Sequence, residues 1–167
     1  MKSKKRKPLL KQLINTLIAI TILSLGYVCY MVVYDLRVRY INYSELNEIS
    51  KLNKEYAARF EGFINTIEKE TGWKVVIISG LRTRKEQDKL KRDNPQNAAV
   101  NKSRHVLGRA IDINLYKRGV LTILRLRKSS SNESWRKTGL AQIARRYRLL
   151  WGGTYKHYHD PVHFEIN

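Results

Sequence analysis

An uncharged, apolar run near the N-terminus is the feature that most constrains what this chain can fold into. Residues 13–34 (LINTLIAITILSLGYVCYMVVY) carry no charged side chain. At about 1.5 Å per helical residue, such a run spans roughly 33 Å, against a hydrocarbon core of about 30 Å. The run is apolar on every side, which disfavours a helix half-buried on a soluble domain. We therefore predict a transmembrane helix over residues 13–34.

The charges beside this run predict its orientation. Residues 1–12 hold six positive charges and no acid, whereas residues 35–39 (DLRVR) hold two positive charges and one negative. This bias predicts a cytoplasmic N-terminus and a domain on the periplasmic or cell-wall side. A cleaved signal peptide is the alternative, but the run exceeds the usual ~7–15 apolar residues and no A-x-A-like site follows. We predict a basic cytoplasmic segment (1–12), an uncleaved signal-anchor, a linker (35–43) and a domain (44–167).

The remainder of the chain is basic. The 167 residues carry 33 Lys and Arg against 14 Asp and Glu, and residues 41–167 alone carry 25 against 13. Such a charge attracts nucleic acid, anionic lipid or an anionic cell-wall polymer. The alternative is a solvated basic surface that binds no specific partner. No nucleic-acid-binding motif is present, so we expect no nucleic-acid partner. Cys29 is the only cysteine, so any metal must be bound by His and carboxylate.

Hydrophobic periodicity in the domain predicts an α+β fold. Apolar residues at three- and four-residue steps predict a helix from Ser44, its N-cap, to about Thr71, with Gly72 as its stop. A second amphipathic helix is predicted from Trp135 to about Leu149. Strands are predicted over residues 73–79, 109–116, 120–126 and 162–166, a charged helix over 84–92, and loops over 93–104 and 129–134. The expected architecture is a small antiparallel or mixed sheet packed with helices, preceded by one transmembrane helix.

Histidine and carboxylate side chains gather in two segments of this domain. Asp112 lies in an apolar strand, where a lone carboxylate would cost many kcal/mol, so it needs a metal or a buried arginine as partner. His105 precedes that strand, and His163 lies in the last strand, three residues after Asp160. Two histidines and one aspartate would fill three positions of a tetrahedral zinc site. Asp160 is then placed to act as the general base.

Four segments resemble the motifs of one family of zinc peptidases. Residues 103–112 (SRHVLGRAID) resemble S-x-H-x-x-G-x-A-x-D, and residues 79–83 (SGLRT) resemble S-G-x-R-[ST]. Residues 151–153 (WGG) and 160–165 (DPVHFE) match the closing W-G-G and D-x-x-H-F elements. The family comprises D-Ala-D-Ala carboxypeptidases, D-Ala-D-Ala dipeptidases and phage L-Ala-D-Glu endopeptidases. The resemblance extends over about residues 60–167.

The resemblance implies a role for each motif residue. It makes His105, Asp112 and His163 the ligands of Zn²⁺ and Asp160 the catalytic base. Arg82 is implied to polarise the scissile carbonyl and stabilise the oxyanion. The alternative is that Arg82 only forms a structural salt bridge.

Five further residues are candidates for support or substrate binding. Ser103 is expected to hold the metal-site loop by hydrogen bonding rather than to act as a nucleophile. Gln87 follows the arginine motif and is a candidate of the same kind. His157 and His159 are candidates for the cleft or for supporting a ligand, although we favour ordinary surface positions. Glu165 shares the face of His163 and is a candidate to orient it.

The resemblance implies a zinc peptidase acting on peptidoglycan stem peptides, and the apolar run over residues 13–34 predicts that it is anchored in a membrane. Family members that trim D-Ala-D-Ala mostly carry Glu where Asp160 stands, and the Asp form followed by H-F-E resembles the L-Ala-D-Glu endopeptidases. We therefore expect an L-Ala-D-Glu endopeptidase. The alternatives are a D-Ala-D-Ala carboxypeptidase or D,D-endopeptidase with the same site, and a non-catalytic cell-wall-binding module.

Overall fold

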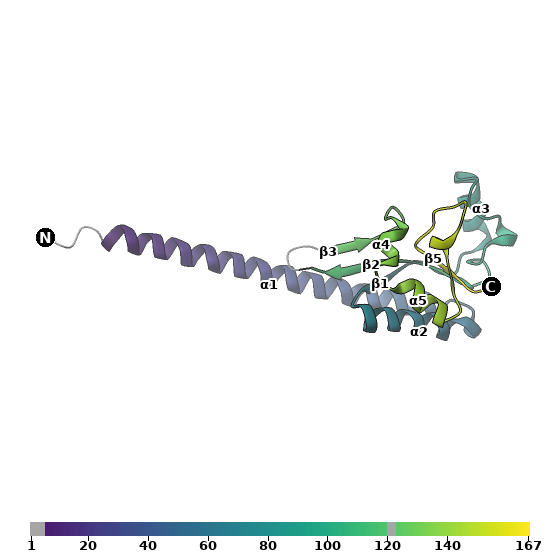
Figure 1. The fold of residues 1–167 in the computed structure, drawn as a ribbon, viewed down its shortest axis with the longest axis horizontal. Coiled ribbons are helices and arrows are strands. Elements are labelled where there is room, and N and C mark those ends of the chain that lie inside the picture. The colour runs from purple at the N-terminus through teal and green to yellow at the C-terminus, as the bar shows by residue number, and fades with distance from the viewer. Residues whose placement is uncertain (1–5, 120–122) are drawn as a thin grey trace. The chain divides into compact units, whose positions relative to one another are not determined.

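The computed structural model describes residues 6–119 and 123–167, which fall into two compact units. The first unit is Met1–Tyr40 and the second is Ile41–Asn167. Figure 1 traces the elements along the chain. The second unit contains the sheet and all of the candidate site residues.

The first unit consists of one long helix, α1 (Arg6–Ser50), which continues into the second unit. Within the described residues, Leu9–Tyr34 is the one helical segment long and apolar enough to cross a membrane. None of its apolar window is buried within the unit, and Leu23 is 74% exposed. The helix expected over residues 13–34 is therefore present, while its insertion into a membrane stays a prediction. Residues 35–43, expected as a linker, are also helical.

The helix α2 (Lys54–Thr71) buries one apolar face, which carries Tyr56, Phe60, Phe63, Ile64 and Ile67. The Asn53 side chain caps its start by accepting a hydrogen bond from the Glu55 backbone N–H at 3.1 Å. Gly72 ends it in the left-handed conformation (φ 67°), as the sequence indicates. The expectation of a single helix from an N-cap at Ser44 is wrong, because α1 runs through that residue and ends at Ser50. The chain then turns before α2 begins.

The sheet is antiparallel throughout, in the order β1-β2-β5-β4, with β3 also paired to β2. Its strands are β1 (Lys74–Ser79), β2 (Ala110–Arg118), β3 (Ile123–Leu126), β4 (Leu150–Trp151) and β5 (His163–Glu165). The predicted α+β class and the predicted strands are confirmed. The beginning of the strand expected over 120–126 lies outside the described residues, and its last four residues pair with β2 as expected.

The remaining helices of the second unit are short. They are α3 (Arg84–Asp93), η1 (Val100–Lys102), α4 (Asn132–Arg136), α5 (Leu140–Arg146) and η2 (Gly152–Thr154). The single helix expected from Trp135 is wrong, because Gly139 takes a left-handed conformation (φ 80°) and divides it. Ser131 caps α4 by accepting from the Ser134 N–H, so part of the loop expected over 129–134 is helical.

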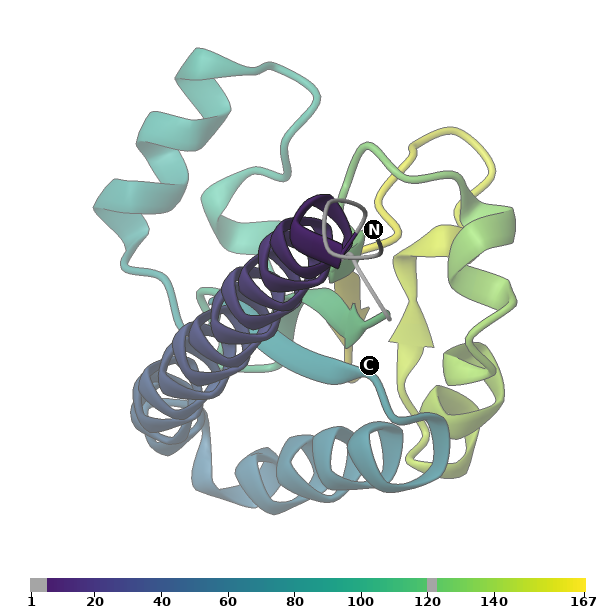
Figure 2. The same ribbon diagram turned by 90° about the vertical axis from the view of Figure 1, so that its left-hand side faces the viewer.

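The core lies between the sheet and the helices α2 and α5, which pack together beside it (Figure 2). Phe63 of α2 packs against Phe164 of β5, with ring centroids 4.9 Å apart, and both side chains are fully buried. The neighbour of Phe164 in β5 is His163, which faces the other way because side chains alternate along a strand. The packing of β5 on α2 therefore fixes the direction in which His163 points.

Candidate metal centre and active-site cleft

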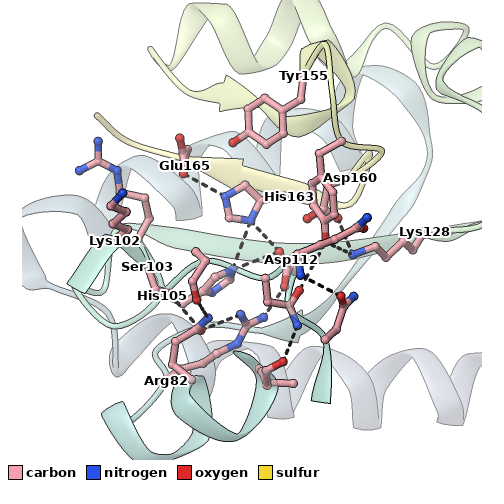
Figure 3. A pocket seen from close by; sticks show the side chains of 18 residues that line it. Arg82, Lys102, Ser103, His105, Asp112, Lys128, Tyr155, Asp160, His163 and Glu165 are labelled. Carbon is pink, nitrogen blue, oxygen red and sulfur yellow. Dashed lines mark hydrogen bonds and ion pairs between the residues drawn. The ribbon is translucent and has the colours of Figure 1, made fainter. Parts of the chain in front are cut away.

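Three candidate ligands converge from three segments of the second unit (Figure 3). His163 Nδ1 lies 2.8 Å from Asp112 Oδ1, and His105 Nε2 lies 3.2 Å from each of these two atoms. Asp112 and His163 are register partners across β2 and β5, whereas His105 comes from the loop before β2. The structure therefore brings together the three residues predicted to bind zinc.

The donor set fits a tetrahedral metal ion. Zn–N bonds of 2.0–2.1 Å place neighbouring ligand atoms about 3.3 Å apart, close to the separations seen here. His105 Nδ1 lies 2.8 Å from the Gly80 carbonyl, which only accepts, so this nitrogen carries the proton and Nε2 presents its lone pair. Glu165 Oε2, 3.1 Å from His163 Nε2, fixes the tautomer of His163 in the same way. Two lone pairs and a carboxylate oxygen thus point at one place, which calls for a cation.

The electrostatics of the cluster lead to the same conclusion. Burial acts to raise the pKa of Asp112, but the close imidazoles of His105 and His163 outweigh it and hold that pKa well below its usual range. Burial acts to lower the pKa of His163, but its bonds to Asp112 and Glu165 raise it to about 9. A proton on His163 is one way to satisfy three converging acceptors, and a metal ion is the other.

Arg82 follows β1 and holds the second oxygen of Asp112. Its Nη2 donates to Asp112 Oδ2 at 2.6 Å and its Nε donates to Ser79 Oγ at 2.8 Å. The remaining nitrogen, Nη1, lies 3.4 Å from Gln87 Oε1. The side chain is 20% exposed and lines the cleft. Arg82 therefore orients a candidate ligand, and its predicted action on the scissile carbonyl stays a prediction.

Ser103 and Gln87 hold the loop that carries His105. Both are buried, and Ser103 Oγ donates to Gln87 Oε1 at 3.0 Å. Gln87 Nε2 in turn donates to the Ala98 carbonyl at 2.8 Å. The two side chains link α3 to the segment before β2, and neither contacts a histidine in a way that would activate a nucleophile.

Asp160 lies in the turn before β5, with its side chain facing the cleft. A Cβ at Gly152 would meet the Asp160 carbonyl oxygen at 2.3 Å, so the W-G-G segment allows the backbone of this turn to approach closely. Trp151 Nε1 donates to the Pro161 carbonyl at 2.8 Å and fixes the same turn. The buried Asp160 Oδ1 accepts no hydrogen bond from the described residues, and it lies 3.2 Å from the ammonium nitrogen of Lys128. That oxygen is available to accept a proton.

The converging side chains line a cleft of about 590 Å³. Lys128, Tyr155 and Tyr158 also line it, and the motif comparison did not identify them. These residues lie outside the matched motifs, so only the folded loops bring them to the site. His159 does not line the cleft: it is exposed, and its Nε2 donates to the Lys128 carbonyl at 2.8 Å.

Comparison with known proteins agrees with this geometry. The sequence model of a family described as D-alanyl-D-alanine carboxypeptidase matches residues 96–166. The family resemblance is confirmed. The crystal structure of the Serratia marcescens L-Ala D-Glu endopeptidase ChiX superposes with a TM-score of 0.53 and 19% identity, covering 72% of this chain and 84% of that one. No curated protein matches the sequence.

The match to the peptidase family falls on the part of the chain that forms the site. His105, Asp112, Asp160 and His163 all lie within the matched residues, whereas Arg82 and Gln87 lie before them. The similarity to the ChiX endopeptidase shows a shared fold. The chain thus matches a family model named for D-Ala-D-Ala over residues 96–166 and has the fold of an enzyme named for L-Ala-D-Glu, so these comparisons leave the choice of bond open.

Proposed function

We propose that the protein is a membrane-anchored zinc peptidase that hydrolyses peptidoglycan stem peptides, with the bond between L-Ala and D-Glu as its target. The observation that carries the proposal is the convergence of two histidine lone pairs and one carboxylate oxygen beside Asp160. The family match supports a peptidase, and the chemistry of the donor set supports zinc.

The residues of the cleft suit amide hydrolysis. Bound zinc would supply Lewis acidity, which polarises a carbonyl oxygen and lowers the pKa of water toward about 7. Asp160, whose Oδ1 is ion-paired with Lys128 but accepts no hydrogen bond, takes the proton of the attacking water and passes it to the leaving nitrogen. Arg82 keeps Asp112 in place and adds a fixed positive charge where the oxyanion develops.

The assignment of the bond rests on sequence. Asp160 stands where D-Ala-D-Ala-trimming relatives mostly carry Glu, and the D-P-V-H-F-E segment resembles that of L-Ala-D-Glu endopeptidases. The fold of the ChiX endopeptidase is compatible with this assignment. A D-Ala-D-Ala carboxypeptidase or D,D-endopeptidase with the same site is the second candidate, favoured by the description of the matching family.

The proposed anchor is residues 13–34, between a cytoplasmic segment (1–12) and a linker (35–43) that leads to the peptidase domain (44–167). The helix Leu9–Tyr34 exposes its apolar side chains, which a hydrocarbon environment would accommodate and water would not. The six positive charges before it favour a cytoplasmic N-terminus. This orientation puts the domain on the side of the membrane where peptidoglycan lies.

The test is a digest of purified peptidoglycan by the full chain in detergent, analysed by mass spectrometry with and without a chelator. Chelator-sensitive release of peptides with a new N-terminal D-Glu is the expected result. Release of free D-Ala would instead favour the second candidate. If the folded, zinc-loaded protein leaves the polymer intact, the peptidase proposal fails and a non-catalytic cell-wall-binding module becomes the leading account.

A further inference from the structure

Lys128 is a cation fixed in the wall of the cleft, and it belongs to none of the peptidase motifs. Its Nζ lies 3.2 Å from Asp160 Oδ1 and donates to Tyr158 Oη at 3.1 Å. It also lies 5.1 Å from the centroid of the Tyr158 ring, within cation–π range. The candidate base therefore has a lysine ammonium as its neighbour on the cleft side (Figure 3).

The backbone around Lys128 is held in place on both sides. Trp135 Nε1 donates to the Arg127 carbonyl at 3.2 Å, and the Arg127 N–H donates to Ser130 Oγ at 3.1 Å. His159 Nε2 donates to the carbonyl of Lys128 itself at 2.8 Å. The turn that carries Lys128 is thus joined to the turn that carries Asp160. A lysine on a pinned turn loses less freedom on binding a ligand than one on an open surface.

The ammonium group of Lys128 keeps capacity for a further partner. It has three N–H donors, of which one serves Tyr158 and a second faces Asp160 Oδ1 at 3.2 Å, which leaves one for a further partner. The side chain is 54% exposed, toward the cleft that it lines. Burial acts to lower the pKa of Lys128, but Tyr158 and Asp160 outweigh it and raise that pKa above its ordinary value. The group therefore remains a cation at neutral pH.

The position of Lys128 relative to Asp160 indicates which part of a substrate it meets. A general base in amide hydrolysis passes its proton to the leaving nitrogen, so Asp160 must lie within hydrogen-bond reach of that nitrogen. A group next to Asp160 is then close to the carbon that carries the nitrogen. In peptidoglycan stem peptides this carbon bears a carboxylate, because D-Glu continues the chain through its γ-carboxyl group and leaves its α-carboxyl group free.

We propose that Lys128 binds a free carboxylate on the carbon attached to the scissile nitrogen, and that the enzyme therefore discriminates against stem peptides in which this group is amidated. The inference rests on the proposed function, because it takes Asp160 as the base. The terminal D-Ala of a D-Ala-D-Ala substrate also has a free carboxylate on the carbon attached to the scissile nitrogen. The experiment must therefore include both the D-Glu and the D-Ala substrates. An amide in place of the carboxylate loses the ion pair and leaves only a neutral carbonyl oxygen to accept from the ammonium.

The kinetic test uses two pairs of peptides with the zinc-loaded full chain in detergent. One pair is L-Ala-D-Glu-L-Lys, linked through the γ-carboxyl group, and its α-carboxamide. The other is an acyl-D-Ala-D-Ala peptide and its C-terminal amide. A hydrogen bond between charged partners typically changes affinity by roughly ten- to hundredfold. We expect kcat/KM for the cleaved pair to favour the carboxylate by at least about tenfold.

Three substitutions assign this preference to Lys128. Lys128→Met keeps most of the length of the side chain without its charge. It should reduce the ratio of kcat/KM for the carboxylate peptide to kcat/KM for the amide peptide to about one. Lys128→Arg keeps the charge and should retain most of the preference. Lys137→Met is the matched control, because Lys137 is 74% exposed and pairs with Glu133 outside the cleft. A wild-type ratio near one, or a ratio that Lys128→Met leaves unchanged, overturns the inference.

A binding measurement separates this inference from the proposed function. The product D-Glu-L-Lys, linked through the γ-carboxyl group, and its α-carboxamide are titrated calorimetrically into the wild type and Lys128→Met. Tighter binding of the carboxylate by about tenfold, lost in Lys128→Met, supports the inference even if no peptide is cleaved, in which case only the hydrolytic function fails. Equal binding of the two products by the wild type overturns the inference even if L-Ala-D-Glu is cleaved.

Discussion

Asp112 and His163 face each other across β2 and β5, with Oδ1 of the first 2.8 Å from Nδ1 of the second. Opposed residues of an antiparallel pair share a face of the sheet, so strand pairing itself aligns the two ligands. A slip of one residue in this pairing would turn His163 to the opposite face. The buried contact of Phe164 with Phe63 opposes such a slip. Core packing and ligand geometry therefore depend on the same three-residue strand.

Substitution of Glu165 tests whether the hydrogen bond at Nε2 of His163 also orients this candidate ligand. The Glu165 carboxylate accepts from His163 Nε2 at 3.1 Å and so presents Nδ1 to the metal position. We expect Glu165→Gln to weaken zinc affinity about 10- to 100-fold, as is typical of partners that orient a ligand. Competition with a chromophoric chelator measures the change. Glu133→Gln, an exposed glutamate on α4, is the control and should leave zinc affinity unaltered.

Gly108 and Gly139 form a pair that separates backbone strain from steric clash. Both take left-handed conformations, with φ of 65° and 80°. A Cβ at Gly108 would lie 2.7 Å from the backbone nitrogen of Asn53, whereas nothing lies within 4 Å of one at Gly139. We expect Gly139→Ala to lower the free energy of unfolding by about 1–2 kcal/mol and Gly108→Ala to lower it further. Denaturant unfolding measures both changes in the free energy of unfolding. Equal changes would show that the backbone near Asn53 moves to accommodate the Cβ at Gly108 without loss of stability.

Sequence periodicity identified the elements of the domain but misplaced their ends. The buried face of α2 was predicted correctly because Phe60, Phe63 and Ile67 follow helical spacing. The turn between α1 and α2 was missed because Ile49 and Leu52 continue that spacing across it, and both are buried. The turn packs instead on Gly108, more than fifty residues away in the chain. A contact of that kind leaves no local pattern in the sequence.

The candidate metal ligands were predicted from motifs, whereas the wall of the cleft was not. The motifs identify His105, Asp112 and His163, and two of these, Asp112 and His163, are register partners across β2 and β5. Lys128 and Tyr158 meet where two irregular turns lie together, joined by the His159 bond to the Lys128 carbonyl. Charge gave no signal either, since Lys128 is one of 33 basic residues. Residues placed by loop conformation alone are therefore found only in the structure.

Arg82 is expected to act both on Asp112 and on the substrate, and a lysine at this position separates the two roles. Lysine cannot reproduce the contacts to Asp112, Ser79 and Gln87 at once. If Arg82 only orients the ligand, saturating zinc should restore activity to Arg82→Lys. If it also stabilises the oxyanion, kcat should remain about 10²- to 10³-fold lower at saturating zinc. Arg146→Lys, in the exposed pair with Glu70, is the control.

Membrane anchoring by residues 13–34 is tested by placing a charge at Leu23. This side chain lies near the middle of the apolar helix and is 74% exposed. A lysine at the centre of a spanning helix costs about 2.5–3.5 kcal/mol on insertion scales, so we expect Leu23→Lys to reduce the fraction of protein that stays with membranes after alkaline extraction. Leu124→Lys, at an exposed position of β3, is the control. Equal retention of both variants would contradict the anchor.

Asp160→Asn distinguishes a peptidase from a binding module that keeps the same fold. Asparagine preserves the shape of the side chain but cannot take a proton from water, so we expect kcat to fall by at least about 10²-fold. Zinc content and thermal stability should stay close to wild type, because Asp160 is not among the three converging ligands. The readout is release of peptides from peptidoglycan, with metal analysis on the same preparations. Loss of zinc together with activity would make Asp160 part of the metal site, and unchanged activity would remove it from catalysis.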